Sequence, residues 1–252
     1  MTFSLAAAGV GVVLLDIEGT TTPIEFVHRT LFSFARAEVR NYLTARIGAS
    51  ADAATVEILS GLRSEHAVDV AAGQPPPPWP DDAAATLDSA VAYVEWLIAR
   101  DRKSRWLKDL QGRIWEEGYR RGDLKGEVYP DVPVALRRWT GAGVRVGIFS
   151  SGSVLAQKLL FAHSNAGDLT PFLSWHFDTA VGPKIEAGSY TRIAEQVASR
   201  PGHILFVSDV TKEIDAARAA GFQTLLCVRP PADPPARPDA NQVVRTFEEI
   251  TT

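Results

Sequence analysis

Short runs of consecutive apolar residues, rich in Val and Ile, alternate along much of this chain with segments of helical periodicity. The apolar runs are 12–15, 144–149, 204–207 and 224–228. The helical segments among the later runs are 132–139, 154–162, 190–198 and 214–220. Strands that are apolar at every position are buried on both faces, and their alternation with amphipathic helices is typical of a parallel sheet covered by helices. The pattern predicts an α/β fold with a doubly wound parallel sheet.

The spacing of the first two apolar runs indicates an insertion. Residues 16–143 separate them, whereas a crossover between parallel strands needs only about a dozen residues. The intervening segments 26–42, 53–62, 83–100 and 103–119 all have helical periodicity. We therefore expect two domains, a core formed by residues 1–21 and 128–252 and an inserted, all-helical cap domain formed by residues 22–127.

Three further segments lead to separate expectations. The proline-rich run 74–80 is expected to be a stiff polyproline connector between two cap helices, with a ligand for a proline-binding module as the alternative. Residues 229–238 are expected to form an irregular surface excursion before a last helix at 243–250. The apolar run 5–15 has no preceding Lys or Arg, as a signal peptide would have, and is expected to be a buried strand.

Charge and cysteine content exclude several classes of protein. A single cysteine, Cys227, cannot form an intramolecular disulfide, which favours a reducing cytoplasm. The chain has 30 acidic and 26 basic side chains and no basic cluster, so nucleic acid is not an expected partner. No apolar stretch is long enough to span a membrane. A small molecule is the expected partner.

Polar side chains follow the apolar runs where the carboxyl ends of the strands should meet. In open α/β sheets the reacting groups lie at that edge. The residues expected there are Asp16 and Glu18 after the first run, Ser150 and Ser151 after the second, Ser208 and Asp209 after the third, and Lys184 from a loop before a helix.

These residue types suit phosphoryl transfer. A carboxylate such as Asp16 can attack phosphorus when nearby charge is neutralised, and Asp16 with Asp209 could bind Mg²⁺. Ser150 and the backbone N–H groups at the following helix N-terminus can hold phosphate oxygens. Lys184 would offset the negative charge, and Glu18 could exchange protons with the leaving group and with water.

The same motifs resemble those of the haloacid dehalogenase-like hydrolase superfamily. Within it, residues 14–24 (LLDIEGTTTPI) are similar to the enolase-phosphatases of methionine salvage, in which Glu replaces the Asp that most relatives have at the position of Glu18. Further similar stretches are 101–103, 110–112, 129–132, 150–161, 176–179 and 208–213. The resemblance covers nearly the whole chain, including the cap.

The resemblance implies a two-step reaction and a set of site residues. The substrate is 2,3-diketo-5-methylthiopentyl-1-phosphate, which is enolised and then dephosphorylated to the acireductone 1,2-dihydroxy-3-keto-5-methylthiopentene. A monomer with one Mg²⁺ per chain is implied. The implied metal ligands are Asp16, Glu18 and Asp209, the substrate-binding residues are Ser150, Ser151 and Lys184, and the catalytic residues are Asp16, Glu18 and Lys184. Pro183 stands where the family often has His, so no histidine base is expected there.

Two other functions remain open from the sequence. One is a phosphatase for another small phosphate ester that lacks the enolase step. The other is a non-catalytic module that binds a phosphorylated metabolite. The group that abstracts the proton in enolisation is also open, with Glu18 and a polar cap residue as candidates. Closure of the cap over the strand ends is expected to exclude water and to set the choice of substrate.

Several residues have both a functional and a structural interpretation. Glu213 and Asp215 either orient Lys184 or the metal shell, or lie on an exposed helix turn. The cap aromatics either pack together or partly line an apolar slot for a methylthio tail; they are Tyr93, Trp96, Trp106 and Trp115. The five histidines have no metal-ligand spacing and are expected to be structural or surface residues.

Overall fold

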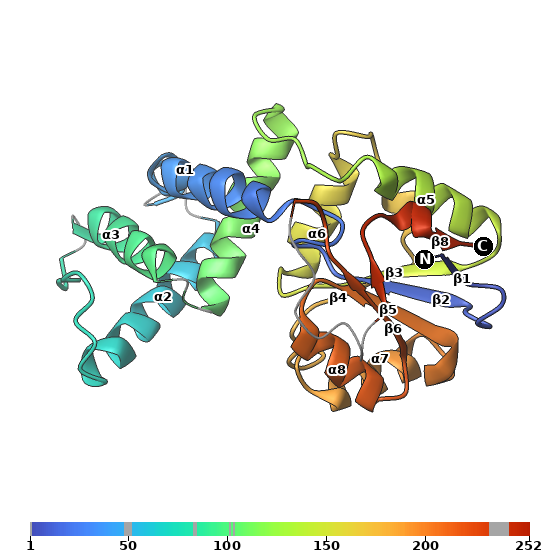
Figure 1. Cartoon of the computed structure of the whole chain (residues 1–252). Helices are drawn as coiled ribbons and strands as arrows, with labels where there is room; N and C mark the ends of the chain where they lie inside the picture. Colours follow the sequence, from blue (N-terminus) through green and yellow to red (C-terminus); the bar gives the residue numbers. More distant parts are fainter. Residues whose placement is uncertain (1, 48–51, 83–84, 101, 103, 232–241) are drawn as a thin grey trace. The chain divides into compact units, whose positions relative to one another are not determined.

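In the computed structural model, a six-stranded parallel sheet forms the centre of one unit of the chain (Figure 1). The strand order is β4-β3-β2-β5-β6-β7. The strands are β2 (Val12–Leu15), β3 (Arg145–Phe149), β4 (Trp175–Phe177), β5 (Ile204–Ser208), β6 (Gln223–Cys227) and β7 (Val243–Val244). Because the chain runs outward from β2 to β3 and β4 and then returns to place β5 on the other side of β2, the sheet is doubly wound. The predicted fold class is confirmed.

The structure describes residues 2–47, 52–82, 85–100, 102, 104–231 and 242–252. The chain divides into one unit formed by Met1–Phe26 with Lys125–Thr252, and a second formed by Val27–Leu124. These bounds lie a few residues from the expected cap limits, 22 and 127. Residues 125–127 fall in the first unit because the Gly126 N–H donates to the His163 carbonyl at 2.8 Å.

Helices cover both faces of the sheet (Figure 1). One face carries α7 (Ala187–Gln196) and α8 (Thr211–Ala219), and the other carries α5 (Asp131–Gly141) and α6 (Val154–Ala162). All four side chains of β2 are buried. On the α7–α8 side, Val12 and Leu14 belong to one apolar cluster with Phe206, Tyr190 and Ile214. This burial explains why the sheet strands appear in the sequence as unbroken apolar runs.

The expectation of a strand over residues 5–15 is wrong for its first half. Only Val12–Leu15 form β2, and residues 5–9 form turns. The Val10 N–H donates to the Leu5 carbonyl at 2.9 Å, and Gly9 has a φ of +66°, a conformation that interrupts an extended strand. A second, two-stranded parallel sheet pairs β1 (Phe3–Ser4) with β8 (Ile250–Thr251).

The expected helix at 243–250 is also wrong. Val243 and Val244 form β7 and pair with Leu226 and Cys227 of β6. A 3-10 helix, Phe247–Glu249, follows after a Thr246 cap, and β8 follows directly. Two adjacent β-branched residues favour the strand, and the capping threonine starts a new element after them. Most of the expected excursion at 229–238 lies outside the described residues, as do Asp101 and Lys103.

Every described element of the second unit is helical. A π-helical turn η1 (Phe26–Leu31) leads into α1 (Phe32–Thr44). The remaining helices are α2 (Ala53–Ala71), α3 (Thr86–Ala99) and α4 (Arg105–Arg121). Tyr93 is fully buried and stacks on Trp96, and the Trp115 indole N–H donates to the Leu31 carbonyl at 2.8 Å. These contacts favour the packing interpretation for the three aromatics.

The proline-rich run connects α2 to α3 and is fastened to this helical unit. The His66 ring lies 2.8 Å from the Pro77 carbonyl through Nε2. The Trp79 ring packs against His66 and Tyr93, with ring centroids 5.6 and 6.0 Å apart.

Two further features concern the environment of the chain. In the residues that the structure describes, no helix is both long enough and apolar enough to cross a membrane. Cys227 is a free thiol buried in β6, where burial raises its pKa to about 12.

Candidate active site

The register of the central strands brings the predicted residues to one edge of the sheet. Leu15, the last residue of β2, lies opposite Ile148 of β3 and Val207 of β5. The Asp16 N–H donates to the Val207 carbonyl at 3.0 Å, which continues the ladder by one residue. The next positions on the neighbouring strands lead to Ser150 on one side and to Ser208 and Asp209 on the other. The site thus lies where the strand order reverses, as is usual for open α/β sheets.

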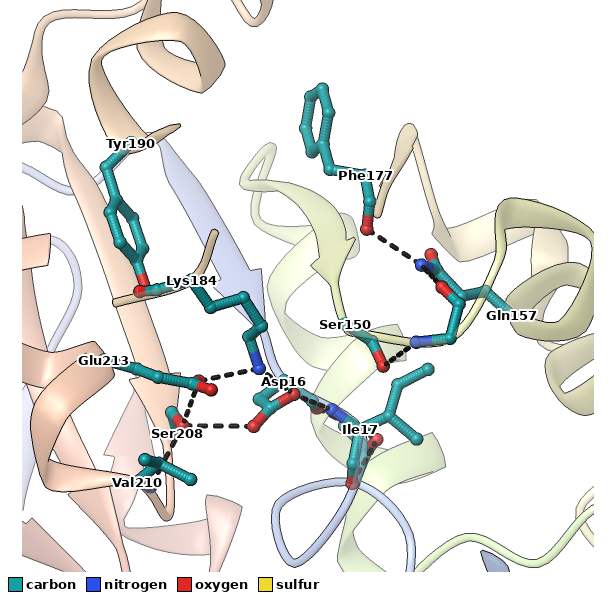
Figure 2. A network of polar contacts seen from close by, with 12 residues as sticks. Asp16, Ile17, Ser150, Gln157, Phe177, Lys184, Tyr190, Ser208, Val210 and Glu213 are labelled. Carbon is teal, nitrogen blue, oxygen red and sulfur yellow. Dashed lines mark hydrogen bonds and ion pairs between the residues drawn. The ribbon is translucent and has the colours of Figure 1, made fainter. Parts of the chain in front are cut away.

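Asp16 is buried, and both of its carboxylate oxygens accept hydrogen bonds (Figure 2). Oδ1 accepts from the Ile17 N–H at 2.8 Å and from Lys184 Nζ at 2.6 Å. Oδ2 accepts from the Ser208 hydroxyl at 3.1 Å. Three donors from three separate segments therefore fix the orientation of this carboxylate.

Lys184 is only 6% exposed and forms two ion pairs, with Asp16 and with Glu213, each at 2.6 Å. Burial alone would lower the pKa of Lys184, but the two carboxylates outweigh it and raise the pKa above its usual value. The Tyr190 hydroxyl donates to the Lys184 carbonyl at 2.7 Å and holds the backbone of this loop. The side chain is therefore a fixed cation beside Asp16.

Glu213 and Ser208 complete the network around Asp16. The Ser208 hydroxyl lies 3.0 Å from Glu213 Oε2 as well as 3.1 Å from Asp16, and it accepts from the Val210 N–H at 3.1 Å. A hydroxyl has one proton, so it donates to one of the two carboxylates at a time. Burial and the charge of Asp16 raise the pKa of Glu213.

Asp209 lies at the same edge of the sheet, close to the charges of Asp16, Glu213 and Lys184. Burial and repulsion from Asp16 and Glu213 raise its pKa to about 7. Its carboxylate packs directly against Gly19, where a Cβ would overlap it, and Gly19 has a φ of +68°. The turn after β2 and the loop after β5 therefore meet at this pair.

The charges of the site fit a divalent cation. Three carboxylates, those of Asp16, Asp209 and Glu213, surround one lysine and leave an excess of negative charge. Mg²⁺ in phosphate-processing sites takes one or two protein carboxylates and completes its shell with water and phosphate. Asp16 and Asp209 satisfy that requirement. A protein-only cage is not expected, and none of three or more His, Cys, Asp or Glu residues is found in the described part of the chain.

The loop at residues 150–153 is held by backbone and side-chain hydrogen bonds. Ser150 is buried, its N–H donates to the Phe177 carbonyl at 3.2 Å, and its hydroxyl accepts from the Gly152 N–H at 3.2 Å. Ser153 caps α6 by accepting from the Ala156 N–H at 3.3 Å. Gln157 in α6 donates through Nε2 to the Gly152 and Phe177 carbonyls, at 2.9 and 2.8 Å (Figure 2). These hydrogen bonds hold Ser150 and the N-terminus of α6 in position.

The structure places the remaining predicted residues as follows. Glu18 is half-buried in the turn that follows Asp16, and Ser151 is exposed in the loop before α6. Asp215 is an exposed residue paired with Arg218. Ser208 was expected at this edge without a role, and the pairing of Glu213 with Lys184 favours the first of its two interpretations. Gln157 was absent from the predicted site. For Glu213 a signal exists, since its spacing of four from Asp209 near a helix start allows both acids to face one edge.

The sequence and the fold match known proteins over most of their lengths. The haloacid dehalogenase-like hydrolase family model matches residues 10–221. Enolase-phosphatase E1 of Synechococcus elongatus is 51% identical over 217 residues, which is 86% of this chain and 88% of that protein. Enolase-phosphatase E1 of Sorangium cellulosum is 45% identical over 226 residues, covering 90% and 91% of the two chains.

A solved structure resembles this chain over nearly its whole length. The UTR4 protein of Saccharomyces cerevisiae superposes with a TM-score of 0.76 at 33% identity, over 95% of this chain and 99% of that chain. More distant structures, such as CbbY of Rhodobacter sphaeroides at 16% identity and a TM-score of 0.54, share the fold alone. The matched region includes all three strands that end at the site. This chain belongs to the enolase-phosphatase E1 family of haloacid dehalogenase-like hydrolases.

Proposed function

We propose that this chain enolises 2,3-diketo-5-methylthiopentyl-1-phosphate and then removes its phosphate, which gives the acireductone 1,2-dihydroxy-3-keto-5-methylthiopentene. The observation that carries the proposal is the buried carboxylate of Asp16, held at the strand edge by Lys184 and Ser208. A fixed carboxylate beside a buried cation suits attack on a phosphate ester. The family membership supplies the substrate.

In the first step, a proton leaves C1 of the diketone and the electron pair of that C–H bond forms the enol double bond. Glu18 takes up this proton, and the C2 carbonyl oxygen receives a proton from solvent and becomes a hydroxyl. Glu18 is the base in this proposal, because it lies in the turn directly after Asp16. The Lys184 cation offsets negative charge on the phosphate and on the substrate oxygen.

In the second step, the Asp16 carboxylate attacks phosphorus and the C1–O–P bond breaks on the phosphorus side. The acireductone leaves with a proton from Glu18. Water, deprotonated by Glu18, then attacks phosphorus and releases inorganic phosphate with Asp16 restored. Ser150, Ser151 and the backbone N–H groups at the start of α6 hold the phosphate oxygens.

Mg²⁺ is the proposed cofactor, with one ion per chain held by the carboxylates of Asp16 and Asp209 and by the backbone carbonyl oxygen of Glu18, so that the Glu18 carboxyl can exchange protons. When bound, it neutralises phosphate charge and acidifies the carbon next to a bound carbonyl. The surplus of carboxylates over lysine around Asp16 supports this proposal.

Glu18→Gln tests whether one residue serves both steps. The amide keeps the size of the side chain but neither accepts nor releases the required proton. Both enol formation and phosphate release should therefore fall together. Enolisation at the full rate with phosphate release blocked would assign the first base to another residue.

The proposed activity itself is tested with two substrates. The diketo phosphate should release phosphate with Mg²⁺ and not with EDTA. A non-hydrolysable phosphonate analogue should give the enol absorbance without phosphate. Absence of the enol signal with phosphate release intact would leave a phosphatase for another ester. Equally negligible phosphate release with Mg²⁺ and with EDTA would favour a binding module.

We further propose that the enzyme works as a monomer in the cytoplasm, on a small molecule and without nucleic acid or membrane partners. The free, buried thiol of Cys227 supports a reducing compartment. Size-exclusion chromatography with light scattering should give a mass near 27.3 kDa. A mass of twice that value would contradict the monomer.

A further inference from the structure

We propose that Arg229, in the loop after β6, is a positioning residue that holds the turn at residues 17–22 in its working conformation. This inference rests on the proposed function for its kinetic test but on the geometry alone for its contacts. Arg229 lies only two residues beyond β6 and is 8% exposed. It therefore brings a buried cation to the same edge of the sheet from a fourth strand.

Each of the three nitrogens of the Arg229 guanidinium has a hydrogen-bond or ion-pair partner. Nε and Nη2 both donate to the Thr20 carbonyl, at 2.9 and 2.7 Å. Nη1 forms an ion pair with Asp131 Oδ2 at 2.6 Å. The planar group also lies over the Tyr129 and Phe247 rings, 4.3 and 4.6 Å from their centroids. A fork donating to one carbonyl, with a fixed counter-ion and two aromatic faces, leaves the guanidinium little freedom to move.

The group that Arg229 holds is the turn between Asp16 and the connection to the helical unit. Within that turn the Ile17 carbonyl accepts the N–H groups of residues 20, 21 and 22, at 3.1, 2.9 and 2.9 Å. The Thr21 hydroxyl donates to the Asp16 carbonyl at 3.1 Å. The turn is internally bonded, and Arg229 ties its Thr20 carbonyl to the rest of the unit.

The same cluster also fixes the chain that returns from the helical unit. The Tyr129 N–H donates to the Thr21 carbonyl at 3.0 Å. Asp131, at the start of α5, accepts from Arg229 and also from the Phe247 N–H at 2.5 Å. One buried arginine therefore links the outgoing turn, the returning segment and the C-terminal region.

The consequence for the reaction concerns Glu18 and Gly19. Glu18 lies two residues from the carbonyl that Arg229 holds, and Gly19 packs against the Asp209 carboxylate. A small displacement of this turn would misplace both the proposed acid–base residue and the contact with Asp209. Misplacement by about 1 Å can cost about 100-fold in rate. We therefore expect the loss of Arg229 to lower kcat more than it changes KM.

The test uses Arg229→Lys and Arg229→Met, with Arg138→Met as the matched control. Arg138 donates through Nη2 to the Phe247 and Ile250 carbonyls, at 2.8 and 2.7 Å, so it holds the same C-terminal region without touching the turn. Phosphate release and enol formation are measured over a range of substrate concentrations, and thermal unfolding is followed by circular dichroism. The lysine variant keeps the charge but loses the fork.

We expect both Arg229 variants to lower kcat by about 10- to 100-fold, with a smaller change in KM. Arg138→Met should lose comparable stability and keep kcat within about 2-fold. A third variant, Arg229→Ala, should regain part of its kcat on addition of methylguanidinium but not of methylammonium. Folded Arg229 variants with wild-type kcat would overturn the proposal, as would an equal loss of kcat in Arg138→Met.

If an Arg229 variant does not fold, Asp131→Asn is tested in its place, because it keeps Arg229 and removes its counter-ion. A fall in kcat of about 3- to 10-fold would support the proposal, and an unchanged kcat would overturn it. Wild-type enzyme on the diketo substrate is measured in parallel. If wild type is inactive there, the proposed function fails, and the Arg229 comparison is decided with p-nitrophenyl phosphate.

Discussion

The backbone of Gly19 packs against the carboxylate of Asp209, a ligand of the proposed metal site. Its φ of +68° is costly for other residues, and an added Cβ would overlap the Asp209 carboxylate. Gly9 offers a matched comparison, because its φ is +66° and nothing lies within 4 Å of a Cβ there. The two positions separate backbone strain from displacement of Asp209.

Gly19→Ala should therefore do more damage than Gly9→Ala. Both should lose about 1–2 kcal/mol of unfolding free energy from the left-handed backbone. Only Gly19→Ala should raise the Mg²⁺ concentration needed for half-maximal phosphate release. Urea unfolding and a Mg²⁺ titration check these outcomes, and identical Mg²⁺ dependence in the two variants would contradict the contact.

Some residues of the site could be predicted from the sequence, but their contacts with one another could not. The order Asp16, Ser150, Lys184 and Asp209 along the strands indicated which side chains share an edge. The pairing of Lys184 with Glu213, and the Ser208 hydroxyl between two carboxylates, depend on side-chain direction within a folded register. Arg229 carried no motif, because its role depends on a carbonyl 209 residues away along the chain.

At the scale of elements, α6 supports the phosphate-binding loop through Gln157. Its Nε2 donates to the carbonyls of Gly152 and Phe177, so the side chain joins the loop to the end of β4. Gln223 has the same chemistry elsewhere, since its Nε2 donates to the Ala8 and Gly202 carbonyls at 2.8 and 2.7 Å. Gln223 begins β6, at the opposite end of the strand from the site.

Gln157→Glu should lower kcat/KM for phosphate release by about 10-fold or more, because an ionised carboxylate repels both carbonyls and displaces the loop. Both substitutions should lower the free energy of unfolding by about 1–3 kcal/mol, but Gln223→Glu should leave kcat/KM unchanged. Steady-state kinetics and urea unfolding of the two variants provide the measurement. An unaffected kcat/KM in Gln157→Glu would show that the loop does not need this support.

Long elements were predictable and short ones were not. The strands β2, β3, β5 and β6 appear in the sequence as unbroken apolar runs, and the helices α5 to α8 show a helical period. β4 spans only Trp175–Phe177 and exists because it pairs with β3. The C-terminal segment looked helical from its apolar spacing, yet Val243 and Val244 pair with β6 instead. Pairing with a distant strand is information that a local pattern does not contain.

At the scale of the whole molecule, the proposed metal should contribute to stability. Metal-free protein keeps three carboxylates around one lysine, and a cation that binds only the folded state raises the melting temperature. Asp209→Asn removes one of these charges. Asp215→Asn removes an exposed acid of α8 that pairs with Arg218, and it serves as the control.

We expect Mg²⁺ to raise the melting temperature of wild type and of Asp215→Asn, and to leave that of Asp209→Asn unchanged. Without metal, Asp209→Asn should be at least as stable as wild type, because a repulsive charge is gone. Differential scanning calorimetry with Mg²⁺ and with EDTA gives both comparisons. A Mg²⁺ response in Asp209→Asn equal to that of wild type would remove this ligand from the proposal.

The two-unit organisation was the prediction that the spacing of apolar runs made most directly. The helical insertion follows β2, so the residue directly after this strand begins the connection to the second unit. The turn at residues 17–22 leads into that connection and is held by several backbone hydrogen bonds. The central claim therefore concerns Asp16, the residue at that point.

Phosphate release by Asp16→Asn from the diketo substrate, with Mg²⁺ present, tests this claim most directly. The amide is nearly isosteric and keeps an acceptor for Lys184, so the variant should fold as wild type does by circular dichroism. Loss of the attacking carboxylate should lower phosphate release by about 1,000-fold or more. A folded Asp16→Asn variant with near-normal turnover would contradict the assignment of Asp16 as the nucleophile.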